Sequence, residues 1–290
     1  MNKKAFLKYL LALFLFGSNG IVASFIDLNS MEIVLLRTLI GSAFLIILFF
    51  MTGSKLTFHR HKKESVFLAA SGIAMGMSWM LLYEAYARIG VSISSLLYYC
   101  GPVIVMALSP LLFKEKLTSN SIVGFIAVII GIVLINLTAF DGNSDIGGIF
   151  CGISSAVMYA LMVICNKKTK KISGLENACL QLAVAFLTVS VFTGLKQGYT
   201  IQISSHSILP IFILGMLNTG IGCYLYFSSI GKLKMQTVAI CGYLEPLSAV
   251  FFSTVFLDEK MLCSQLIGGS LIILGAITSE LSDINKKRGR

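Results

Sequence analysis

The feature that most constrains the fold is a stretch of sequence that occurs twice, at Leu97–Glu115 and again at Gly242–Lys260. With a shift of 144 residues and no gap, eight of the 33 positions from 99 to 131 are identical in the two copies. The identical pairs are Tyr99/Tyr243, Pro102/Pro246, Ser109/Ser253, Glu115/Glu259, Lys116/Lys260, Gly124/Gly268, Ile129/Ile273 and Gly131/Gly275. Shared Pro, Glu, Lys and Gly are hard to obtain by chance in apolar sequence. We therefore infer an internal duplication and expect two repeats, at residues 1–141 and 145–290.

Composition places this duplication in a membrane. The chain is 56% hydrophobic and only 12% charged, a balance that soluble domains do not show. Apolar runs recur along the whole chain, and each is long enough to cross a hydrocarbon core of about 30 Å as a helix. We therefore expect an all-α integral membrane protein that crosses the cell membrane (inner or plasma membrane) several times, with the lipid bilayer as its partner. A retained first helix fits the basic and then apolar N-terminus better than a signal peptide.

The distribution of basic residues predicts the topology. The ten expected helices are 5–25, 31–51, 65–87, 94–113, 119–138, 147–166, 175–195, 208–229, 237–257 and 264–281. With a cytoplasmic N-terminus, all but four of the 23 lysines and arginines fall on the inner side. The exceptions are Arg88, Lys196 and Lys260 outside and Arg37 within a span. The positive-inside rule therefore predicts that both termini are cytoplasmic. The net charge of +10 then reflects topology, so no nucleic-acid partner is expected.

Ten spans divide into two repeats of five, and five is an odd number. The second repeat must therefore enter the membrane from the side opposite to the first. Inverted repeats of this kind are typical of secondary transporters, in which two near-equivalent halves alternate around a site near the midplane of the bilayer. The duplication thus predicts a transporter architecture.

The sequence offers no sign of an enzyme. It has no H-E-x-x-H, G-x-S-x-G, Walker A or G-x-G-x-x-G motif, so proteolysis, lipid hydrolysis and nucleotide-driven transport lack support. The seven cysteines form no C-x-x-C pair, and we interpret them as small core residues. His59 and His61 lie in a basic loop and are interpreted as solvated residues. We expect no catalytic residue, no cofactor and no metal site.

Glu245 is the first candidate for a site residue. It lies roughly 12 Å into the ninth expected helix, at ~1.5 Å per residue, and directly before Pro246, which interrupts the backbone hydrogen bonds nearby. Ionisable groups at such depth are functional candidates by default. We interpret Glu245 as a group that binds a substrate ammonium or a proton. The alternative is a carboxylate that hydrogen-bonds a neighbouring helix.

Three further charged residues have two interpretations each. Glu84 and Arg88 are four residues apart in the order that favours a helical ion pair, but Glu84 could also bind substrate. Arg37 requires a counter-charge or backbone carbonyls as partners in its span. A substrate carboxylate would supply that charge, and so would a glutamate such as Glu84.

Aromatic and polar side chains add a candidate cavity lining. Trp79, Tyr83 and Tyr86 share one helix face, and a buried tyrosine needs a partner for its hydroxyl. We also assign Tyr99, Tyr224, Tyr243 and Asn19 to this lining. Rings and carboxylates together can hold a cationic amine by cation–π contact and charge. The alternative is a belt of aromatic residues at the membrane surface, which fits Tyr86 best and Tyr99 and Tyr243 least.

Glycines mark the close helix contacts. Gly72 and Gly76, and again Gly148 and Gly152, have the small-x-x-x-small spacing that lets helices approach closely. Gly124, Gly131, Gly268 and Gly275 do the same in the fifth and tenth expected helices. We expect these contacts inside one bundle, with a homodimer face as the alternative.

Taken together, the chain resembles the drug/metabolite transporter superfamily, in particular its EamA-type ten-helix members. The residues that carry the resemblance are Arg37, Tyr83–Tyr86, Gly90, Pro102, Glu115–Leu117, Gly124, Gly131, Tyr224–Gly231, Glu245–Pro246, Glu259–Lys260, Gly268 and Gly275. The resemblance implies a secondary carrier with a central cavity lined by helices 1, 3, 4, 6, 8 and 9. It does not name the cargo, because such proteins carry amino acids, amines, sugars and nucleotide sugars.

We therefore predict a secondary-active transporter of a small polar metabolite, an amino acid or amine, with proton coupling through Glu245 as an open option. One alternative is an aromatic-cage importer of a quaternary ammonium such as choline, which would not need Arg37. A different class is a non-transporting membrane sensor or assembly protein.

Overall fold

Helices make up all the regular secondary structure of residues 2–115, 118–135, 145–256 and 263–288, which the computed structural model describes. The expected all-helical class is therefore confirmed for this part of the chain. Lys116, Leu117, Glu259 and Lys260 of the duplicated stretch lie outside the described residues, as does the expected repeat boundary at 141.

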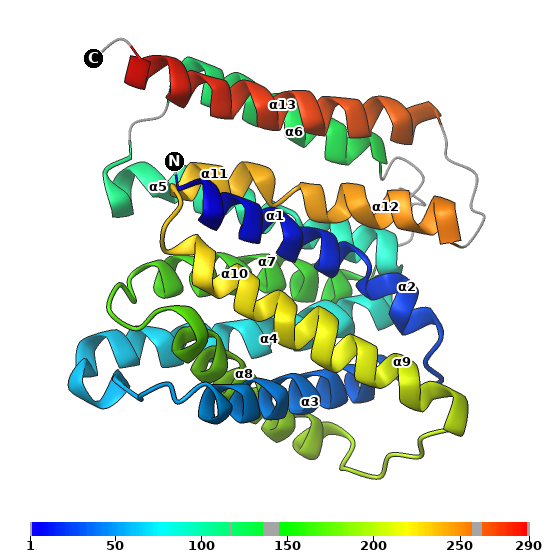
Figure 1. Ribbon diagram of the computed structural model, residues 1–290. Coiled ribbons are helices and arrows are strands. Elements are labelled where there is room, and N and C mark those ends of the chain that lie inside the picture. The colour runs from blue at the N-terminus through cyan, green and yellow to red at the C-terminus, as the bar shows by residue number, and fades with distance from the viewer. Residues whose placement is uncertain (1, 116–117, 136–144, 257–262, 289–290) are drawn as a thin grey trace.

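The described helices fall into ten segments that correspond to the ten expected spans (Figure 1). Their bounds are α1 Lys3–Gly17, α2 Asn19–Ser24, α3 Ser30–Met51, α4 Lys62–Tyr98, α5 Cys100–Phe113, α6 Ser119–Ile135, α7 Ile146–Lys167, α8 Gly174–Lys196, α9 Ile208–Phe212, the π-helix η4 Ile213–Ile221, α10 Gly222–Ile230, α11 Met235–Cys241, α12 Leu244–Phe256 and α13 Cys263–Arg288. By length and composition, six helical segments within the described ranges can each cross a membrane: Lys3–Ser24, Ser30–Met51, Lys62–Ile89, Ile146–Lys167, Gly174–Lys196 and Ser205–Ile230. The protein is thus built as a multi-pass membrane protein.

Two of the spans are broken at equivalent places. One break falls at Tyr99, between α4 and α5, and the other at Gly242 and Tyr243, between α11 and α12. Pro102 and Pro246 are each the third residue of the helix that follows the break. A proline is tolerated there because the first turn of a helix needs no N–H for its own hydrogen bonds. Each duplicated proline therefore lies in the first turn of the helix that begins after the break.

The connection expected at residues 88–93 is not a separate loop, because helical backbone continues in α4 as far as Tyr98. Residues 88–98 contain no proline, and Gly90 is their only glycine, the residue type of lowest helix propensity after proline. The hydroxyl of Tyr86 nevertheless lies 3.3 Å from Oγ of Ser95. Nine residues of straight helix span about 13.5 Å, farther than these two side chains can reach. The helix must therefore bend between Tyr86 and Ser95.

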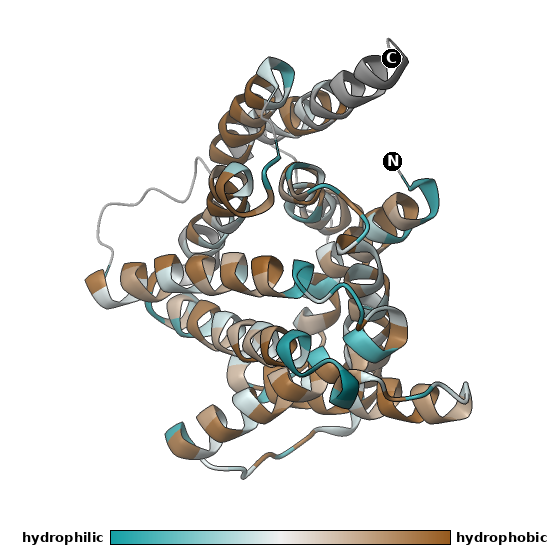
Figure 2. Ribbon diagram, turned by 90° about the vertical axis from the view of Figure 1, so that its left-hand side faces the viewer, coloured by the Kyte–Doolittle hydropathy of each residue, from teal (hydrophilic) through white to brown (hydrophobic). Residues whose placement is uncertain are grey.

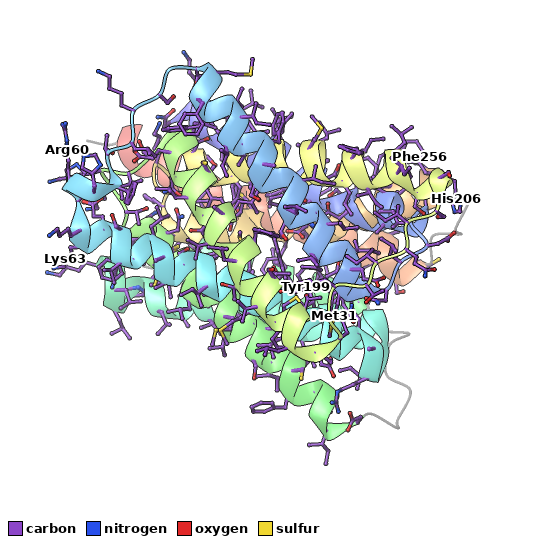
Figure 3. The ribbon with its side chains drawn as sticks, turned by 90° about the horizontal axis from the view of Figure 1, so that it is seen from below. Met31, Arg60, Lys63, Tyr199, His206 and Phe256 are labelled. Atoms are coloured by element: carbon purple, nitrogen blue, oxygen red, sulfur yellow. The ribbon has the colours of Figure 1, made fainter. Side chains whose placement is uncertain are left out.

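The bundle has two chemically distinct ends. Both termini lie at one end (Figure 1), which also carries Arg60 and Lys63, whereas His206 and Phe256 lie at the other (Figure 3). The first end is named the basic end here. It is defined by Lys3, Lys62, Lys114, Lys167 and Lys232, which stand at the start of α1, the start of α4 and the ends of α5, α7 and α10. The other is the opposite end.

The sides of the bundle are apolar. Figure 2, which looks onto the basic end, shows hydrophobic residues along the helices and hydrophilic ones mainly at their ends and in the loops. Large side chains such as Phe50, Phe150 and Leu187 are exposed on the surface of the bundle. An apolar surface of this extent suits contact with lipid chains rather than with water.

Close helix contacts inside the bundle use the expected glycines. A Cβ at Gly72 would meet Val184 of α8, and one at Gly76 would meet Thr188 of the same helix. A Cβ at Gly148 would meet Ile89, and one at Gly152 would meet Leu97. Because all four glycines face helices of their own chain, these positions do not form the homodimer face that the sequence left as an alternative.

Helices α6 and α13 lie side by side at one edge of the bundle (Figure 1). A Cβ added at Gly131 of α6 would lie 2.5 Å from the backbone oxygen of Gly268 in α13, and one added at Gly275 would clash with the backbone oxygen of Gly124. Gly124 is equivalent to Gly268, and Gly131 to Gly275, so each repeat makes the same contact with the other. The two helices are therefore antiparallel and related by a local two-fold axis, as in an isologous interface.

This contact leads to a first prediction. Gly131→Ala should lower the melting temperature of the protein in detergent, because the new methyl group meets backbone that cannot rotate away. Overpacking of this kind costs roughly 1–3 kcal/mol, and the middle of that range exceeds the ~1 kcal/mol that alanine gains over glycine in helix propensity. Gly231→Ala is the control, since nothing lies within 4 Å of its added Cβ. Equal melting temperatures for the two variants would show that α6 and α13 are not tightly packed at this point.

Candidate functional site

A cavity of about 450 Å³ lies inside the bundle. Its walls come from α1, α2, α3, α4, α7, α10 and α12, and the polar members of the lining are Asn19, Ser30, Arg37, Ser78, Ser95 and Glu245. The resemblance to ten-helix carriers implies walls from the first, third, fourth, sixth, eighth and ninth helices. The structure adds the second, α3, which carries Arg37 into the lining.

Glu245 enters the cavity from the first turn of α12. Helix α1 passes very close to it, since a Cβ at Gly17 would lie 2.8 Å from the Glu245 backbone oxygen. Its carboxylate forms no hydrogen bond or ion pair with any side chain in the part of the chain that the structure describes. A carboxylate that held two helices together would have such a partner. The acceptor atoms of Glu245 are therefore available to a ligand.

Arg37 enters the same cavity from α3 and is 5% exposed. Its Nε donates a hydrogen bond to Oγ1 of Thr219 at 2.9 Å, and its guanidinium carbon lies 4.9 Å from the centre of the Trp79 ring. The Thr219 hydroxyl in turn donates to the backbone oxygen of Leu214, five residues earlier, in the π-helix η4. Irregular helix of this type is frequent at functional sites. Here it turns Thr219 toward the arginine.

Among the described residues, the Arg37 guanidinium makes no ion pair with a carboxylate. One cavity thus holds a positive and a negative side chain that do not neutralise each other by direct contact. Asn19 adds an unused acceptor, because its buried Oδ1 has no hydrogen-bond partner among the described residues. Such a constellation can bind a ligand that carries both charges.

Aromatic rings form most of the remaining wall. All three members of the expected stripe, Trp79, Tyr83 and Tyr86, line the cavity, and so does Tyr99. Tyr86 therefore does not belong to a belt at the membrane surface, which was its alternative. Tyr98, Tyr159 and Tyr226 also line the cavity, and the hydroxyls of the last two lie 3.4 Å apart. The sequence did not indicate Tyr159 as a site residue, because a single tyrosine in an otherwise apolar helix forms no recognisable pattern.

Two predicted tyrosines lie elsewhere. Tyr224 is absent from the lining, and Lys8 lies 5.0 Å from the centre of its ring. Its neighbour Tyr226 takes the cavity position, since residues two apart on a helix face nearly opposite directions. Tyr243 is 1% exposed and donates its hydroxyl hydrogen bond to the backbone oxygen of Tyr99 at 2.7 Å. It therefore packs behind the cavity wall in this structure.

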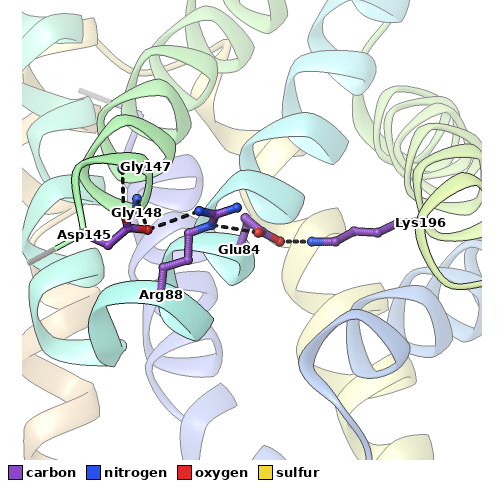
Figure 4. Close-up of polar contacts among 6 residues, drawn as sticks. All are labelled: Glu84, Arg88, Asp145, Gly147, Gly148 and Lys196. Atoms are coloured by element: carbon purple, nitrogen blue, oxygen red, sulfur yellow. Dashed lines mark hydrogen bonds and ion pairs between the residues drawn. The ribbon is translucent and has the colours of Figure 1, made fainter.

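Glu84 and Arg88 also lie outside the cavity, in a chain of charges at the opposite end (Figure 4). Nε of Arg88 donates to Glu84 at 2.9 Å, and Lys196 donates to the other carboxylate oxygen of Glu84. Arg88 also donates to Asp145 at 3.1 Å. The ion-pair interpretation of Glu84 and Arg88 describes this geometry, and the pairing of Glu84 with Arg37 is not formed.

Asp145 connects this network to α7. Its carboxylate accepts hydrogen bonds from the backbone N–H groups of Gly147 and Gly148, so it caps the N-terminus of the helix. The Arg88 guanidinium, together with the Gly147 N–H, lowers the pKa of Asp145 below its usual value. The group therefore stays ionised at neutral pH and contributes its stabilisation until the pH falls through this lowered pKa.

Contacts between the two repeats close the basic end. The Tyr9 hydroxyl donates to the backbone oxygen of Val238 at 2.7 Å. The carboxylate of Glu115 accepts the backbone N–H of Met235 at 2.9 Å and that of Gln236 at 3.3 Å, so it caps α11. Lys114, in the left-handed conformation with φ 55°, turns the chain at the end of α5 just before this glutamate. The duplicated Glu115 thus has a structural role that the sequence alone did not indicate.

The cavity extends away from the basic end, toward the opposite end of the bundle. Its lining includes Gly20 and Ala23 of α2 and Ser30 at the start of α3, and the turn between these helices lies at the opposite end. Tyr9, Glu115 and α11 thus join the two repeats at the basic end, while the cavity lining reaches toward the opposite end.

A second polar cluster was not foreseen. Asn166, Asn177, Gln181 and Ser71 are buried between α4, α7 and α8, where Asn166 donates to Asn177 at 2.8 Å and Gln181 to Ser71 at 2.9 Å. With the shift of 144, Gln181 is the residue equivalent to Arg37. Its amide is used within the cluster, so this position in the second repeat stabilises helix packing. The cation of the site comes from the first repeat alone.

Among the described residues, no group of three or more His, Cys, Asp or Glu side chains is placed to hold a metal ion.

Comparison with known proteins gives consistent matches. The model of the EamA-like transporter family matches residues 3–137 and again residues 146–280. YxxF of Bacillus subtilis (strain 168), named as an uncharacterized transporter, is 26% identical over 282 residues, which cover 93% of this chain and 88% of the relative. YicL of Salmonella typhimurium, named as an uncharacterized inner membrane transporter, is 22% identical over 301 residues, with 99% and 98% covered. A solved crystal structure with 18% identity superimposes with a TM-score of 0.83 over 96% of this chain and 98% of its own, which supports the fold.

Proposed function

The chain belongs to the EamA-like transporter family, and from this premise we propose that it is a secondary-active carrier of a small zwitterionic metabolite, an amino acid or a close relative. The carrying observation is that Glu245 and Arg37 line one cavity without a direct ion pair. A ligand with one ammonium and one carboxylate group would give each of these two side chains a partner of opposite charge. Its size is compatible with the volume of about 450 Å³, which is within the usual range for small-molecule sites.

The chemistry of each wall supports this assignment. A planar guanidinium can donate two parallel hydrogen bonds to a carboxylate, and its stacking on Trp79 keeps it oriented. The free carboxylate of Glu245 attracts an ammonium, and the unused Oδ1 of Asn19 can accept one of its hydrogens. The tyrosine rings surround the rest of the ligand and favour a positive group by cation–π contact.

Alternating access is the mechanism that the repeats favour. The local two-fold axis between α6 and α13 supports an inverted relation of the two halves. The excess of lysine and arginine at the basic end supports a cytoplasmic position for that end and for both termini. On this topology, the present structure is closed to the cytoplasm, and its cavity extends outward. The name of the Salmonella relative supports an inner-membrane location.

A quaternary ammonium cargo is the second candidate. The aromatic rings around the cavity favour it, since such rings bind cations well. The position of Arg37 opposes it, because a fixed positive charge in the same cavity repels a cargo without a carboxylate. The sensor alternative is opposed by membership of a transporter family.

The test is a ligand screen on the purified protein in detergent, followed by counterflow in liposomes. The probes are leucine, its amine without the carboxylate, choline and glucose. Ligands that bind the folded state raise its melting temperature by mass action, so leucine or another amino acid should raise it more than the matched amine. The amino acid that stabilises most should then exchange across the liposome membrane. Stabilisation by choline above every amino acid, or by glucose alone, would contradict the proposal.

A further inference from the structure

Contacts between the duplicated segments of the two repeats are of two kinds in this structure. Between α6 and α13 both reciprocal contacts exist, from Gly131 to Gly268 and from Gly275 to Gly124. Exchanging the conformations of the two repeats would leave such a symmetric contact unchanged. It can therefore serve as a static part of the carrier.

Tyr99 and Tyr243 are also equivalent, and their contact is not symmetric. The hydroxyl of Tyr243 donates to the backbone oxygen of Tyr99 at 2.7 Å, while the reciprocal bond from the Tyr99 hydroxyl to Tyr243 is not formed. The two rings lie 6.5 Å apart, centre to centre. Tyr243 is 1% exposed, whereas Tyr99 lines the cavity. Two equivalent tyrosines thus occupy two different positions, one in the cavity wall and one buried behind it.

The backbone at each tyrosine can accept a hydrogen bond from the side chain of the other. Each stands where a span is broken into two helices, and each is followed three residues later by a duplicated proline. At such a break the carbonyl groups are free from the regular helical ladder and can accept a side-chain hydrogen bond. The backbone oxygen of Tyr99 does so here, and the equivalent oxygen of Tyr243 stands at the equivalent break.

We propose that Tyr99 and Tyr243 form a reciprocal pair that exchanges roles between the two states of the carrier. When the cavity opens toward the basic end, the Tyr99 hydroxyl donates to the backbone oxygen of Tyr243 and Tyr99 becomes buried. Tyr243 then takes the place of Tyr99 as a binding residue in the wall of the cavity. The proposal rests on alternating access as put forward above, but not on the identity of the cargo.

The exchange must be linked to the closure of the basic end. Tyr243 follows α11 by two residues, and α11 is held by the Tyr9 hydroxyl at Val238 and by the Glu115 carboxylate at Met235. Opening that end separates these groups, so the N-terminal amides of α11 lose their protection against hydrogen exchange. These amides therefore report on which state the protein occupies.

The test compares Tyr243→Phe with Tyr99→Phe by hydrogen–deuterium exchange of peptides that cover residues 233–241. Removing the hydroxyl of Tyr243 takes a hydrogen bond from the present state, so exchange in α11 should become faster by about 2- to 10-fold. Removing the hydroxyl of Tyr99 takes nothing from this state and weakens the other, so exchange should become slower. The double variant should return toward the wild-type rate. Tyr224→Phe, a tyrosine outside the cavity, and the peptides of α6 should show no change.

Shifts in the same direction for the two single variants, or no shift for Tyr99→Phe, would overturn the proposal. Tyr99→Phe is decisive even if Tyr243→Phe folds poorly. The Tyr99 hydroxyl makes no hydrogen bond with the described residues in this structure, so its removal should not impair folding. The exchange is measured without cargo. Opposite shifts in a protein that binds no amino acid would retain the tyrosine pair and reject the cargo, whereas amino-acid binding with parallel shifts would do the reverse.

Discussion

Glu245→Gln should weaken the binding of an amino acid by about 10- to 100-fold, which corresponds to the loss of one charge-assisted hydrogen bond. The protein itself should fold as well as the wild type. In this structure the carboxylate has no described hydrogen-bond or ion-pair partner to lose, and glutamine has the same shape. Removing an uncompensated charge from a half-buried position does not destabilise a helix bundle. Loss of binding without loss of melting temperature is therefore the expected result.

The measurement compares leucine with its analogue that lacks the amino group, using melting temperatures over a range of ligand concentrations. The wild type should prefer leucine, and Glu245→Gln should have lost most of that preference. Glu84→Gln is the matched control, because this glutamate lies outside the cavity and pairs with Arg88 and Lys196. A drop in the melting temperature of ligand-free Glu245→Gln, with leucine preference retained, would make Glu245 a packing residue.

The architecture could be predicted from the sequence because it depends on averages over many residues. Apolar runs, the asymmetry of lysine and arginine, and the duplication each sum a weak signal over a whole span or repeat. The family matches in both halves agree with the inferred duplication. The positions of the breaks at Tyr99 and Tyr243 were harder to predict from the sequence. A proline indicates an irregular helix, but a helix tolerates proline in its first turn, so the proline does not itself mark the break. The interruption therefore lies before each proline rather than at it.

The site depends on single residues and on helix rotation, which periodicity determines poorly. Tyr224 and Tyr226 are equally plausible cavity residues in the sequence. They face nearly opposite sides of their helix, and only Tyr226 lines the cavity. For Glu84 the local rule was informative, since a partner four residues away leads to a nearby ion pair. The contact of Arg37 with Thr219 joins residues 182 positions apart, and no local pattern indicates which helix faces α3.

The role of Tyr243 illustrates a limit of another kind. From the sequence it was assigned to the cavity together with Tyr99, whereas the structure places only Tyr99 there. A duplicated sequence does not say which copy occupies which state. A static site and a pair that exchanges roles therefore give the same pattern in the chain, and a structure is needed to show the asymmetry.

Arg37→Gln should abolish the discrimination between an amino acid and the amine that lacks its carboxylate. In the wild type the guanidinium can bind the carboxylate through charge-assisted hydrogen bonds, so the amino acid should bind about 10- to 100-fold more tightly than the amine. Glutamine keeps a donor that can reach Thr219, but it removes the charge and the stacking on Trp79. The amine should bind the variant at least as well as the wild type, because a repulsive positive charge has been removed.

Comparing two ligands on one variant separates recognition from folding. A general loss of structure lowers the affinity for both ligands, whereas loss of the carboxylate partner lowers it for the amino acid alone. Arg88→Gln serves as the control, since this arginine pairs with Glu84 and Asp145 outside the cavity, and it should preserve the discrimination. If Arg37→Gln still prefers the amino acid by the wild-type ratio, the carboxylate binds elsewhere. The positive charge of Arg37 then serves to balance the carboxylate of Glu245 in the same cavity rather than to bind the cargo.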